Sequence, residues 1–323
     1  MFASSRLITL LCAALAVVGS SPVLAAYPDK PIHLVVSTSP GGGADVTARL
    51  LVPELSKRLG QTIIVDNKPG ASGMIAGKYV ADQRADGYTY LFDITTAAVN
   101  PSLYANMPYT PLKDLVPVTQ VLQAPNVLVV NPSVPVSTVQ EFIAYAKSKN
   151  GDLAYASSGN GSAQHLAGEM FKDRTGIKMT HVPYKGGGPA LADVVAGHVP
   201  VFFAFLASAA PHIKAGRLKA IALAGNARSP LLPDVPTIAE SGLPGFEVYD
   251  FNGFFAPAGT PPEAINRMQR DLAATLATPT VRAQLEALGA EPVGNTPQEF
   301  ESFLRNEIKK WGEVIKKANI KIE

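Results

Sequence analysis

The feature that most constrains the fold is a repeated order of a short apolar run, a turn rich in Gly or Ser, and an amphipathic stretch. The run Ile32–Ser37, the turn Pro40–Gly43 and the stretch Asp45–Leu59 set this pattern. Short apolar runs that alternate with amphipathic helices are typical of parallel strands whose connecting helices cover both faces of a sheet. The sequence therefore predicts an α/β fold with parallel sheets.

The same order recurs along the chain. Further strands are predicted at Thr62–Asp66, Tyr88–Ile94, Asn126–Val130, Leu153–Ala156, Thr180–Val182, Val199–Phe203, Leu218–Leu223 and Glu247–Phe255. Ser137 and Gln140 have the spacing of a capping box and are predicted to open a helix that ends near Ser148. Two helices are expected to close the chain. At roughly 150 residues per domain, the 323 residues are expected to form two domains.

The first 26 residues have the pattern of an export signal. Arg6 precedes the apolar run Leu7–Val18, which is too short to span a bilayer, and small residues favour cleavage after Ala25 or Ala26. Cys12 is the only cysteine and follows two leucines within this run, which excludes a lipoprotein pattern. The mature protein is therefore expected to be soluble and exported, without disulfides, zinc–thiolate sites or a cysteine nucleophile.

The charge balance excludes two classes of protein. With 47% hydrophobic and 17% charged residues, the chain is too apolar to be disordered. With 28 basic and 26 acidic side chains and no long basic run, it is not suited to bind nucleic acid. The Gly-rich turns also lack the Gly-x-Gly-x-x-Gly pattern, and no Lys-Ser/Thr follows the glycines as it does in a nucleotide-binding loop.

Three joints between a strand and a helix have unusual chemistry, at residues 39–45, 157–162 and 184–188. Each combines glycines with the start of a helix, whose unpaired N–H groups and partial positive charge form an anion site. In α/β sheets, ligands bind beyond the carboxyl ends of the strands, where such joints gather. Two joints from different domains are expected to hold a carboxylate between them, although the glycines alone would also serve tight turns.

Candidate ligand-binding residues come from these joints and from the nearby strand ends. They are Ser39, Gly41, Gly42, Gly43, Asp45, Thr95, Thr96, Ser157, Ser158, Gly161, Ser162, His165, Tyr184 and Lys185. The glycines offer backbone N–H groups, and the serines and threonines offer hydroxyls or helix caps. Asp45 is expected to cap the first helix or hold ordered water, while Lys185 either pairs with a second carboxylate or is an exposed loop lysine. Tyr184 is expected to line the cleft or to belong to the core.

Several motifs match a known family in chain order. They are Tyr27–Ile32, Pro40–Gly42 with Asp45 and Arg49, Asn67–Ala71, Asp86–Thr89, His181–Gly187, Pro211–Gly216, Leu232–Thr237 and Ala256–Pro261. In these residues, which extend over the whole mature chain, the sequence resembles the solute receptors of tripartite tricarboxylate transporters, also called Bug receptors.

The resemblance implies a two-lobed periplasmic binding protein of type II-like architecture, with two doubly wound sheets joined by two crossing segments. The extended stretches Val118–Asn126 and Glu247–Phe255 are predicted to be the crossings. Residues 27–124 and 250–323 then form the first lobe and residues 125–249 the second. The family grips a carboxylate with amides, hydroxyls and ordered water, which map here onto the loops 39–45 and 157–162.

The resemblance also implies the protein's partners. A small mono- or dicarboxylate is expected to bind in the cleft, and the lobes are expected to close and deliver it to the transmembrane permease subunits. We expect a monomer without catalytic residues, cofactor or metal. The near-neutral charge favours recognition by backbone dipoles over a cationic pocket.

The sequence departs from the family pattern in two places. Ser37 and Thr38 stand where relatives often have Pro-Phe, so hydroxyls replace an aromatic ring. Many relatives have an aspartate where this chain has Ala204, so an amino-acid ligand is not favoured. Asp250 and Phe251, at the second crossing, are candidate replacements in the site.

Two other functions are weighed against transport. A secreted serine hydrolase would use Ser157, Ser158 or Ser162 with His165 or His181, but the loop lacks the Gly-x-Ser-x-Gly nucleophile elbow. A sensor that presents its liganded form to a membrane histidine kinase would share both fold and site with a transport receptor. The sequence does not separate that sensor from a receptor.

Overall fold

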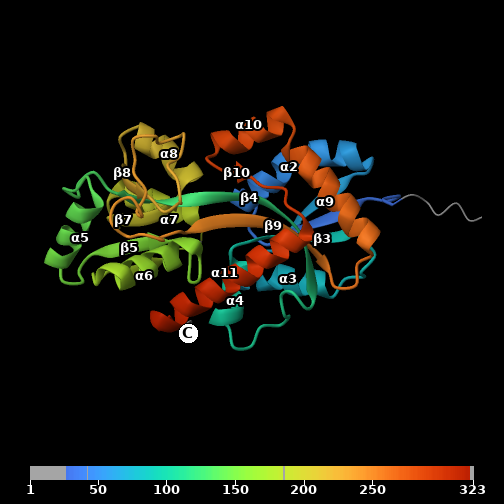
Figure 1. The fold of residues 1–323 in the computed structure, drawn as a ribbon, viewed down its shortest axis with the longest axis horizontal. Coiled ribbons are helices and arrows are strands. Elements are labelled where there is room, and N and C mark those ends of the chain that lie inside the picture. The colour runs from blue at the N-terminus through green and yellow to red at the C-terminus, as the bar shows by residue number, and fades with distance from the viewer. Residues whose placement is uncertain (1–26, 42, 185, 321–323) are drawn as a thin grey trace, which may run out of the picture.

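The computed structural model describes residues 27–41, 43–184 and 186–320 (Figure 1). The predicted export signal, Gly42 and Lys185 lie outside these residues. The strands are β1 (Ile32–Val36), β2 (Ile63–Asn67), β3 (Thr89–Ile94), β4 (Leu115–Val130), β5 (Ala154–Ser157), β6 (Thr180–Pro183), β7 (Val201–Phe205), β8 (Lys219–Leu223), β9 (Tyr249–Pro257) and β10 (Glu291–Pro292).

The helices follow the strands in alternation over most of the chain. They are α2 (Gly43–Leu59), the short 3₁₀ turn η1 (Ala71–Gly73), α3 (Met74–Ala81), α4 (Thr96–Leu103), α5 (Val139–Ser148), α6 (Ala163–Thr175), α7 (Gly187–Ala196), α8 (Leu206–Lys214), α9 (Pro262–Leu276), α10 (Pro279–Ala287) and α11 (Pro297–Lys317). This alternation confirms the predicted α/β class.

The strands divide into two groups along the order β2-β1-β3-β9-β4-β7-β5-β6. The outer pairs are parallel, with β1 between β2 and β3 and with β5 between β6 and β7. The central strands run antiparallel, since β9 pairs β3 and β4, and β4 pairs β7 and β8. The parallel pairing expected from the alternation is thus found in the outer groups, whereas the two long strands at the predicted crossings pair antiparallel at the centre.

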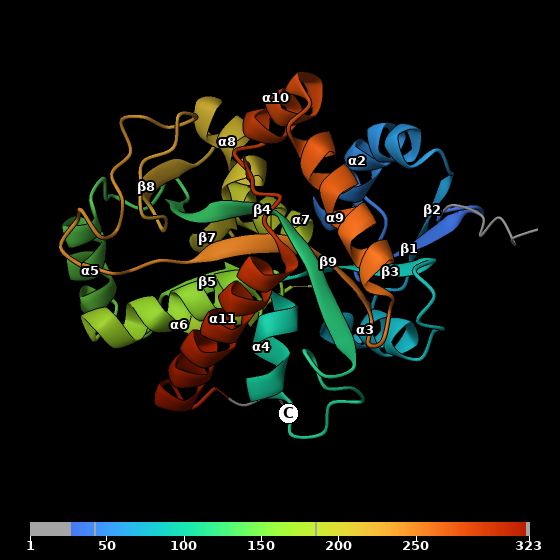
Figure 2. The same cartoon turned by 45° about the vertical axis from the view of Figure 1, so that its right-hand side comes forward.

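β4 and β9 join the two groups, as Figures 1 and 2 show. Residues 115–125 of β4 pair with β9, whereas residues 126–130 pair with β7 and β8. Irregularities interrupt the β4–β9 register between Pro117 and Thr119 and between Gln120 and Leu122. The result is the two-lobed architecture, with the first lobe built around β1–β3 and the second around β5–β8.

Each lobe has helices packed against its strands. In the first lobe, Leu51 of α2 and Met268 of α9 join the fully buried ring of Phe92 in one apolar cluster. In the second lobe, Phe142 of α5 and Phe171 of α6 lie with their ring centroids 5.8 Å apart. Full burial of side chains of this size stabilises the fold by about 1.5–3 kcal/mol each.

Two details differ from the sequence-based expectations. Thr138, not Ser137, caps α5, because its hydroxyl accepts from Glu141 N at 3.1 Å while Glu141 Oε2 accepts from Ser137 N at 2.7 Å. The predicted capping box of Ser137 and Gln140 is therefore wrong: the N-cap lies one residue later, and the Glu141 carboxylate accepts from the residue before the N-cap. Three helices, not two, follow β9, since Pro279 begins the additional short helix α10 after the N-cap Thr278.

Candidate ligand-binding site

The loop before α2 is held closed by Asp45. Its carboxylate accepts from Gly41 N at 2.9 Å, from Arg49 Nε at 3.0 Å and from Asn67 Nδ2 at 2.9 Å. Burial of the side chain opposes ionisation, but these bonds from Arg49, Gly41 and Asn67 lower the pKa of Asp45 overall. Asp45 therefore secures the loop, and Gly41 N already has a partner. Of the predicted hydrogen-bond donors in the described part of this loop, Ser39 and Gly43 N remain, and both residues are exposed.

The loop before α6 is held in a similar way. Ser162 caps α6, accepting from His165 N at 3.2 Å and donating to Gly159 O at 2.7 Å. Gly161 N donates to His165 Nδ1 at 3.1 Å. Two of the predicted ligand groups, Ser162 and Gly161 N, thus build the loop itself.

A pair of stacked histidines supports this loop from beneath. The rings of His165 and His181 lie 3.9 Å apart and nearly parallel, at 9°. Burial lowers the pKa of His165 to about 4, and burial together with the neighbouring His165 lowers that of His181 to about 3. Near neutral pH both rings are uncharged, which leaves His165 Nδ1 free to accept from Gly161 N.

Ser157 is buried beneath the loop. Its hydroxyl lies 2.6 Å from His181 Nε2 and has no exposed surface. A Ser–His contact of this kind resembles part of a hydrolase site, but the Ser157 hydroxyl is engaged within the loop, where it also lies 3.1 Å from both Gly159 N and Gly159 O. Ser157 therefore serves the packing of the loop in this structure.

A line of hydrogen bonds connects the second lobe to the first. Ser158 Oγ donates to Gln164 Oε1 at 2.6 Å, and Gln164 Nε2 donates to Asp250 Oδ2 on β9 at 2.9 Å. Thr95 Oγ1 lies 3.5 Å from Asp250 Oδ1 and accepts from Phe251 N at 3.0 Å. Residues of α6, β9 and the end of β3 thus meet at one seam between the lobes.

Asp250 is the charged centre of this seam. Burial raises its pKa to about 7, although hydrogen bonds from Thr95 and Asn126 oppose the rise. With its amide nitrogen turned toward the carboxylate, Asn126 donates to Asp250 Oδ2 at 3.2 Å. Asp250 therefore joins the two lobes and titrates near neutral pH.

The lobes also touch through Gly161 and α4. Gly161 is buried with φ +76°, and a Cβ there would lie 2.4 Å from Leu103 Cδ1 and 3.6 Å from Val99 Cγ1. The loop of the second lobe thus lies directly against a helix of the first. Only glycine combines this positive φ with so close an approach.

Two predicted residues adjoin the seam through their backbone but direct their side chains elsewhere, since Phe251 N donates to Thr95 Oγ1 and Tyr184 N donates to Ser157 O at 3.1 Å. Phe251 is fully buried and packs edge-to-face on Phe303, with the centroids 5.1 Å apart, so it belongs to the core and does not line a cleft. Tyr184 donates from its hydroxyl to Asp193 Oδ2 at 2.6 Å, which ties the ring to α7.

Comparison with known proteins decides the family. Residues 47–320 match the model of the tripartite tricarboxylate transporter family receptor. The chain belongs to this family. It is 38% identical to Protein BugT of Bordetella pertussis over 99% of both chains. The receptor architecture is thus shared along the whole sequence.

Solved structures agree with this membership. The Rhodopseudomonas palustris protein Rpa4515, solved with adipate, is 38% identical, with a TM-score of 0.86 over 91% of this receptor and 99% of that chain. MatC of the same species, solved with malate, is 33% identical, with a TM-score of 0.81 over 90% of this receptor and 100% of that chain. The chain is therefore a solute-binding receptor of the periplasmic type. Within its described part, none of the helices is both long and apolar enough to cross a membrane.

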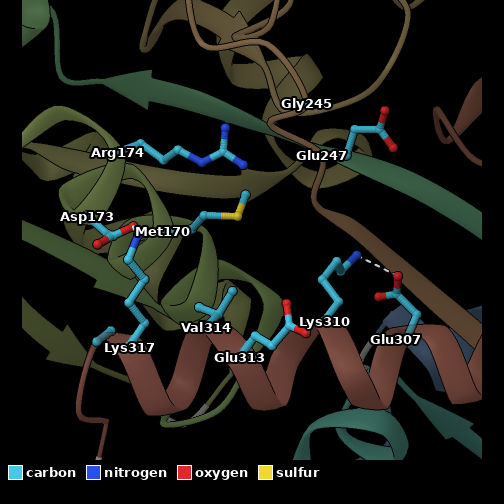
Figure 3. Close-up of a pocket in the computed structure, with 11 residues that line it drawn as sticks. Met170, Asp173, Arg174, Gly245, Glu247, Glu307, Lys310, Glu313, Val314 and Lys317 are labelled. Carbon is cyan, nitrogen blue, oxygen red and sulfur yellow. Dashed lines mark hydrogen bonds and ion pairs between the residues drawn. The ribbon is translucent and has the colours of Figure 1, made fainter.

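A hollow of about 480 Å³ lies between α6 and α11 (Figure 3). Charged side chains line it, among them Arg174, Glu247 and Lys310. At one end Lys317 Nζ pairs with Asp173 Oδ2 at 2.7 Å. None of the predicted site residues lies among those that line this hollow.

Sequence reasoning missed three residues of the receptor's seam region, Gln164, Asn126 and Asp93. Gln164 occupies the first turn of α6, where an exposed helical glutamine is the ordinary expectation. Asp93 gave a clearer signal, since it interrupts the apolar run Tyr90–Ile94 and is 1% exposed. A charged residue inside a buried strand is rare without a partner or a function.

Proposed function

We propose that this receptor captures a small mono- or dicarboxylate between its two lobes in the periplasm and delivers it to transmembrane permease subunits. The lobes would comprise residues 27–124 with 250–323, and residues 125–249. The family and the adipate- and malate-bound relatives support a carboxylate ligand. The predicted signal at residues 1–26 would direct export and be removed after Ala25 or Ala26.

The observation that carries this proposal is the contact between the 157–162 loop and the first lobe. Gly161 packs on Leu103, and Ser158 reaches Asp250 through Gln164, so groups from both lobes converge on one seam. A ligand that touches both lobes only when they are together stabilises the closed state and thereby shifts the population.

Recognition in this seam would use neutral donors. Arg49, which reaches the first loop, is already paired with Asp45. The groups that we assign to the ligand's carboxylate are the Ser39 hydroxyl, Gly43 N–H and ordered water, together with the Ser158 hydroxyl once its proton turns from Gln164 to the ligand. Each hydrogen bond to a charged group contributes about 1.5–3 kcal/mol.

Calorimetry on the mature chain tests capture. The panel contains aliphatic carboxylates of three to six carbons and aromatic carboxylates. We expect one of them to bind with a stoichiometry of one molecule per chain and to raise the melting temperature of the protein. Ser158→Ala is expected to weaken binding several-fold, whereas Ser302→Ala, on the exposed face of α11, serves as the matched control. If no carboxylate of the panel raises the melting temperature at millimolar concentration, the proposal is refuted.

Delivery to a permease is tested separately, in cells. Deletion of the gene is expected to abolish uptake of the radiolabelled ligand, and the restored wild-type gene to recover it. Normal uptake combined with lost transcriptional induction would instead favour the histidine-kinase sensor. Mass spectrometry of the exported protein checks the cleavage position.

A further inference from the structure

Three polar side chains of the first lobe converge on Gly73, the N-cap of α3. A Cβ at Gly73 would lie 3.1 Å from Asp93 Oδ1, 3.4 Å from Ser37 Cβ and 3.4 Å from Thr96 Oγ1. Gly73 has φ +86°, and its missing side chain is what allows these groups to approach from β1, β3 and α4. Asp93, Ser37 and Thr96 therefore form one cluster, which we call the Asp93 cluster.

The Asp93 cluster has hydrogen-bonding capacity that the described residues do not use. Asp93 Oδ1 accepts from Ile94 N at 2.8 Å, but Asp93 Oδ2, Ser37 Oγ and Thr96 Oγ1 have no partner at hydrogen-bond geometry among the described residues. The three residues are 1%, 3% and 7% exposed. Buried polar atoms are normally paired, so a group of unpartnered ones calls for a function.

No described cation neutralises the carboxyl group. Burial raises the pKa of Asp93 to about 6, opposed by the nearby Ser37 hydroxyl and the Ile94 amide, and no charged side chain contributes. Near neutral pH the group is thus mainly a carboxylate, which only accepts hydrogen bonds. A buried carboxylate without a counter-charge is costly, and a donor brought from outside removes that cost.

The cluster lies on the first-lobe side of the seam. Thr96 directly follows Thr95, whose hydroxyl is 3.5 Å from Asp250 Oδ1. The same helix, α4, contacts Gly161 of the opposite lobe through Val99 and Leu103. The Asp93 cluster is thus adjacent in sequence to the seam residue Thr95, on a helix that contacts the opposite lobe.

We propose that Asp93, with Ser37 and Thr96, recognises a hydrogen-bond donor on the carbon chain of the carboxylate ligand, either an ammonium or a hydroxyl group. This rests on the proposed function. An unsubstituted carboxylate would leave Asp93 unpaired and bring a second negative charge near it. Sites built to bond a polar group discriminate strongly against analogues that lack it. The absence of an acid at Ala204 thus does not disfavour amino acids, since Asp93 supplies one from the other lobe.

Matched ligands test the subsite on the full mature chain by calorimetry at pH 7.5. The sets are propionate, lactate and alanine; succinate, malate and aspartate; and adipate, 2-hydroxyadipate and 2-aminoadipate. Within the set that binds, we expect the ammonium or the hydroxyl member to bind at least about 10-fold more tightly than the unsubstituted acid. Comparison of the hydroxyl-bearing and the ammonium-bearing ligand in that set identifies which donor the Asp93 cluster binds.

The isosteric variant Asp93→Asn is expected to remove most of this preference while binding of the unsubstituted acid stays the same or improves. Ser37→Ala and Thr96→Val are expected to reduce the preference for the substituted ligand less. If circular dichroism shows that Asp93→Asn is not folded, these two variants are used for the test instead. A preference unchanged in the folded variants overturns the subsite. The subsite is also overturned if the preference for the substituted ligand is lost in Asp250→Asn but kept in Asp93→Asn.

The ligand series separates the two proposals. Equal binding of all members of a set overturns the Asp93 subsite and leaves carboxylate capture standing. Binding of none of the nine compounds, nor of any other carboxylate in the panel, overturns both.

Discussion

Gln164 of α6 donates a 2.9 Å hydrogen bond from Nε2 to Oδ2 of Asp250 on the crossing strand β9. The same amide accepts from Ser158 through Oε1 at 2.6 Å. Because one planar amide makes both bonds, the position of the 157–162 loop is coupled to the strand that joins the lobes. Any displacement of Ser158 on ligand binding would therefore be transmitted through Gln164 to β9.

Replacing Gln164 with leucine should uncouple the loop from the hinge. The change keeps the size of the side chain but leaves Ser158 and Asp250 each without one partner. We expect carboxylate affinity to fall on the order of 10-fold, about 1.4 kcal/mol. Calorimetry measures this loss, and Gln83→Leu is the control, since the Gln83 amide bonds only to the exposed Tyr79 carbonyl. Equal affinities of the two variants would show that the coupling is unimportant.

Gly161→Ala should weaken the closed state through a steric effect. A Cβ at residue 161 would lie 2.4 Å from Leu103 Cδ1, whereas Gly176, with a similar φ of +68°, has no atom within 4 Å of its Cβ position. Gly176→Ala therefore controls for backbone strain, which costs about 1 kcal/mol at either site. We expect only Gly161→Ala to lose affinity, and Leu103→Ala to restore part of it in the double variant. Small-angle scattering measures how far the liganded proteins close. If Gly161→Ala and Gly176→Ala close to the same extent, the proposed steric effect at residue 161 is contradicted.

Asp250 should make the fold less stable as the pH rises. Its pKa is about 7 in the folded chain against an ordinary value of 3.8, so the folded state binds the extra proton between these values. The resulting stability is complete below the lower value and is lost as the pH rises through the upper one. Urea unfolding from pH 5 to 8 should show that the free energy of unfolding of Asp250→Asn rises relative to that of the wild type, by up to about 1.4 kcal/mol per pH unit. Other groups titrate equally in both proteins, so parallel curves would disprove this assignment.

His165 should have the opposite pH dependence. Its pKa falls from 6.5 to about 4 on folding, so its contribution to stability is complete above pH 6.5 and is lost as the pH falls through 4. In His165→Asn, the side-chain oxygen can still accept from Gly161 N but does not titrate. We expect this variant to lose less stability than the wild type between pH 7 and 4.5 in urea unfolding. A loss equal to that of the wild type would assign the acid sensitivity to other groups.

Asp45→Ala should destabilise the fold without a direct effect on ligand contact. The variant leaves Gly41 N, Arg49 and Asn67 without their shared acceptor. We expect a loss of about 1–3 kcal/mol in the free energy of unfolding. Asp66→Ala is the control because Asp66 makes a single exposed pair with Lys68. Similar losses in both variants would mean that the loop does not depend on Asp45.

The order of elements could be predicted because it rests on local patterns. The apolar runs and Gly-rich turns locate β1, the start of α2 and the loop 157–162 to within about two residues. The roles of individual groups could not be predicted, since they depend on side chains that approach from other elements. The backbone N–H of Gly161 donates to His165, and that of Gly41 donates to Asp45. Two glycines that were expected to donate to the ligand are therefore already hydrogen-bonded to side chains of the helix that follows each loop.

Long-range pairing explains the remaining differences. Nothing local shows that β4 continues from Leu115 to Val130, because its two halves pair with different partners. Asp250 was identified from its place at the crossing, but its contact with Gln164 required the fold to bring residues 86 positions apart together. Phe251 differs from Asp250 by one position and faces the core, which follows from the alternation of side chains along a strand.

The ladder of β4 and β9 runs from one lobe into the other, interrupted by the two irregularities near Pro117 and Gln120. Separating the lobes must therefore bend a hydrogen-bonded pair of strands, and every rung resists the deformation. If the lobes separate as the proposed function requires, this pair of strands is expected to act as an elastic joint, unlike a flexible peptide linker. The stiffness of its hydrogen-bonded ladder would then limit both how widely the lobes open and how quickly a bound ligand leaves.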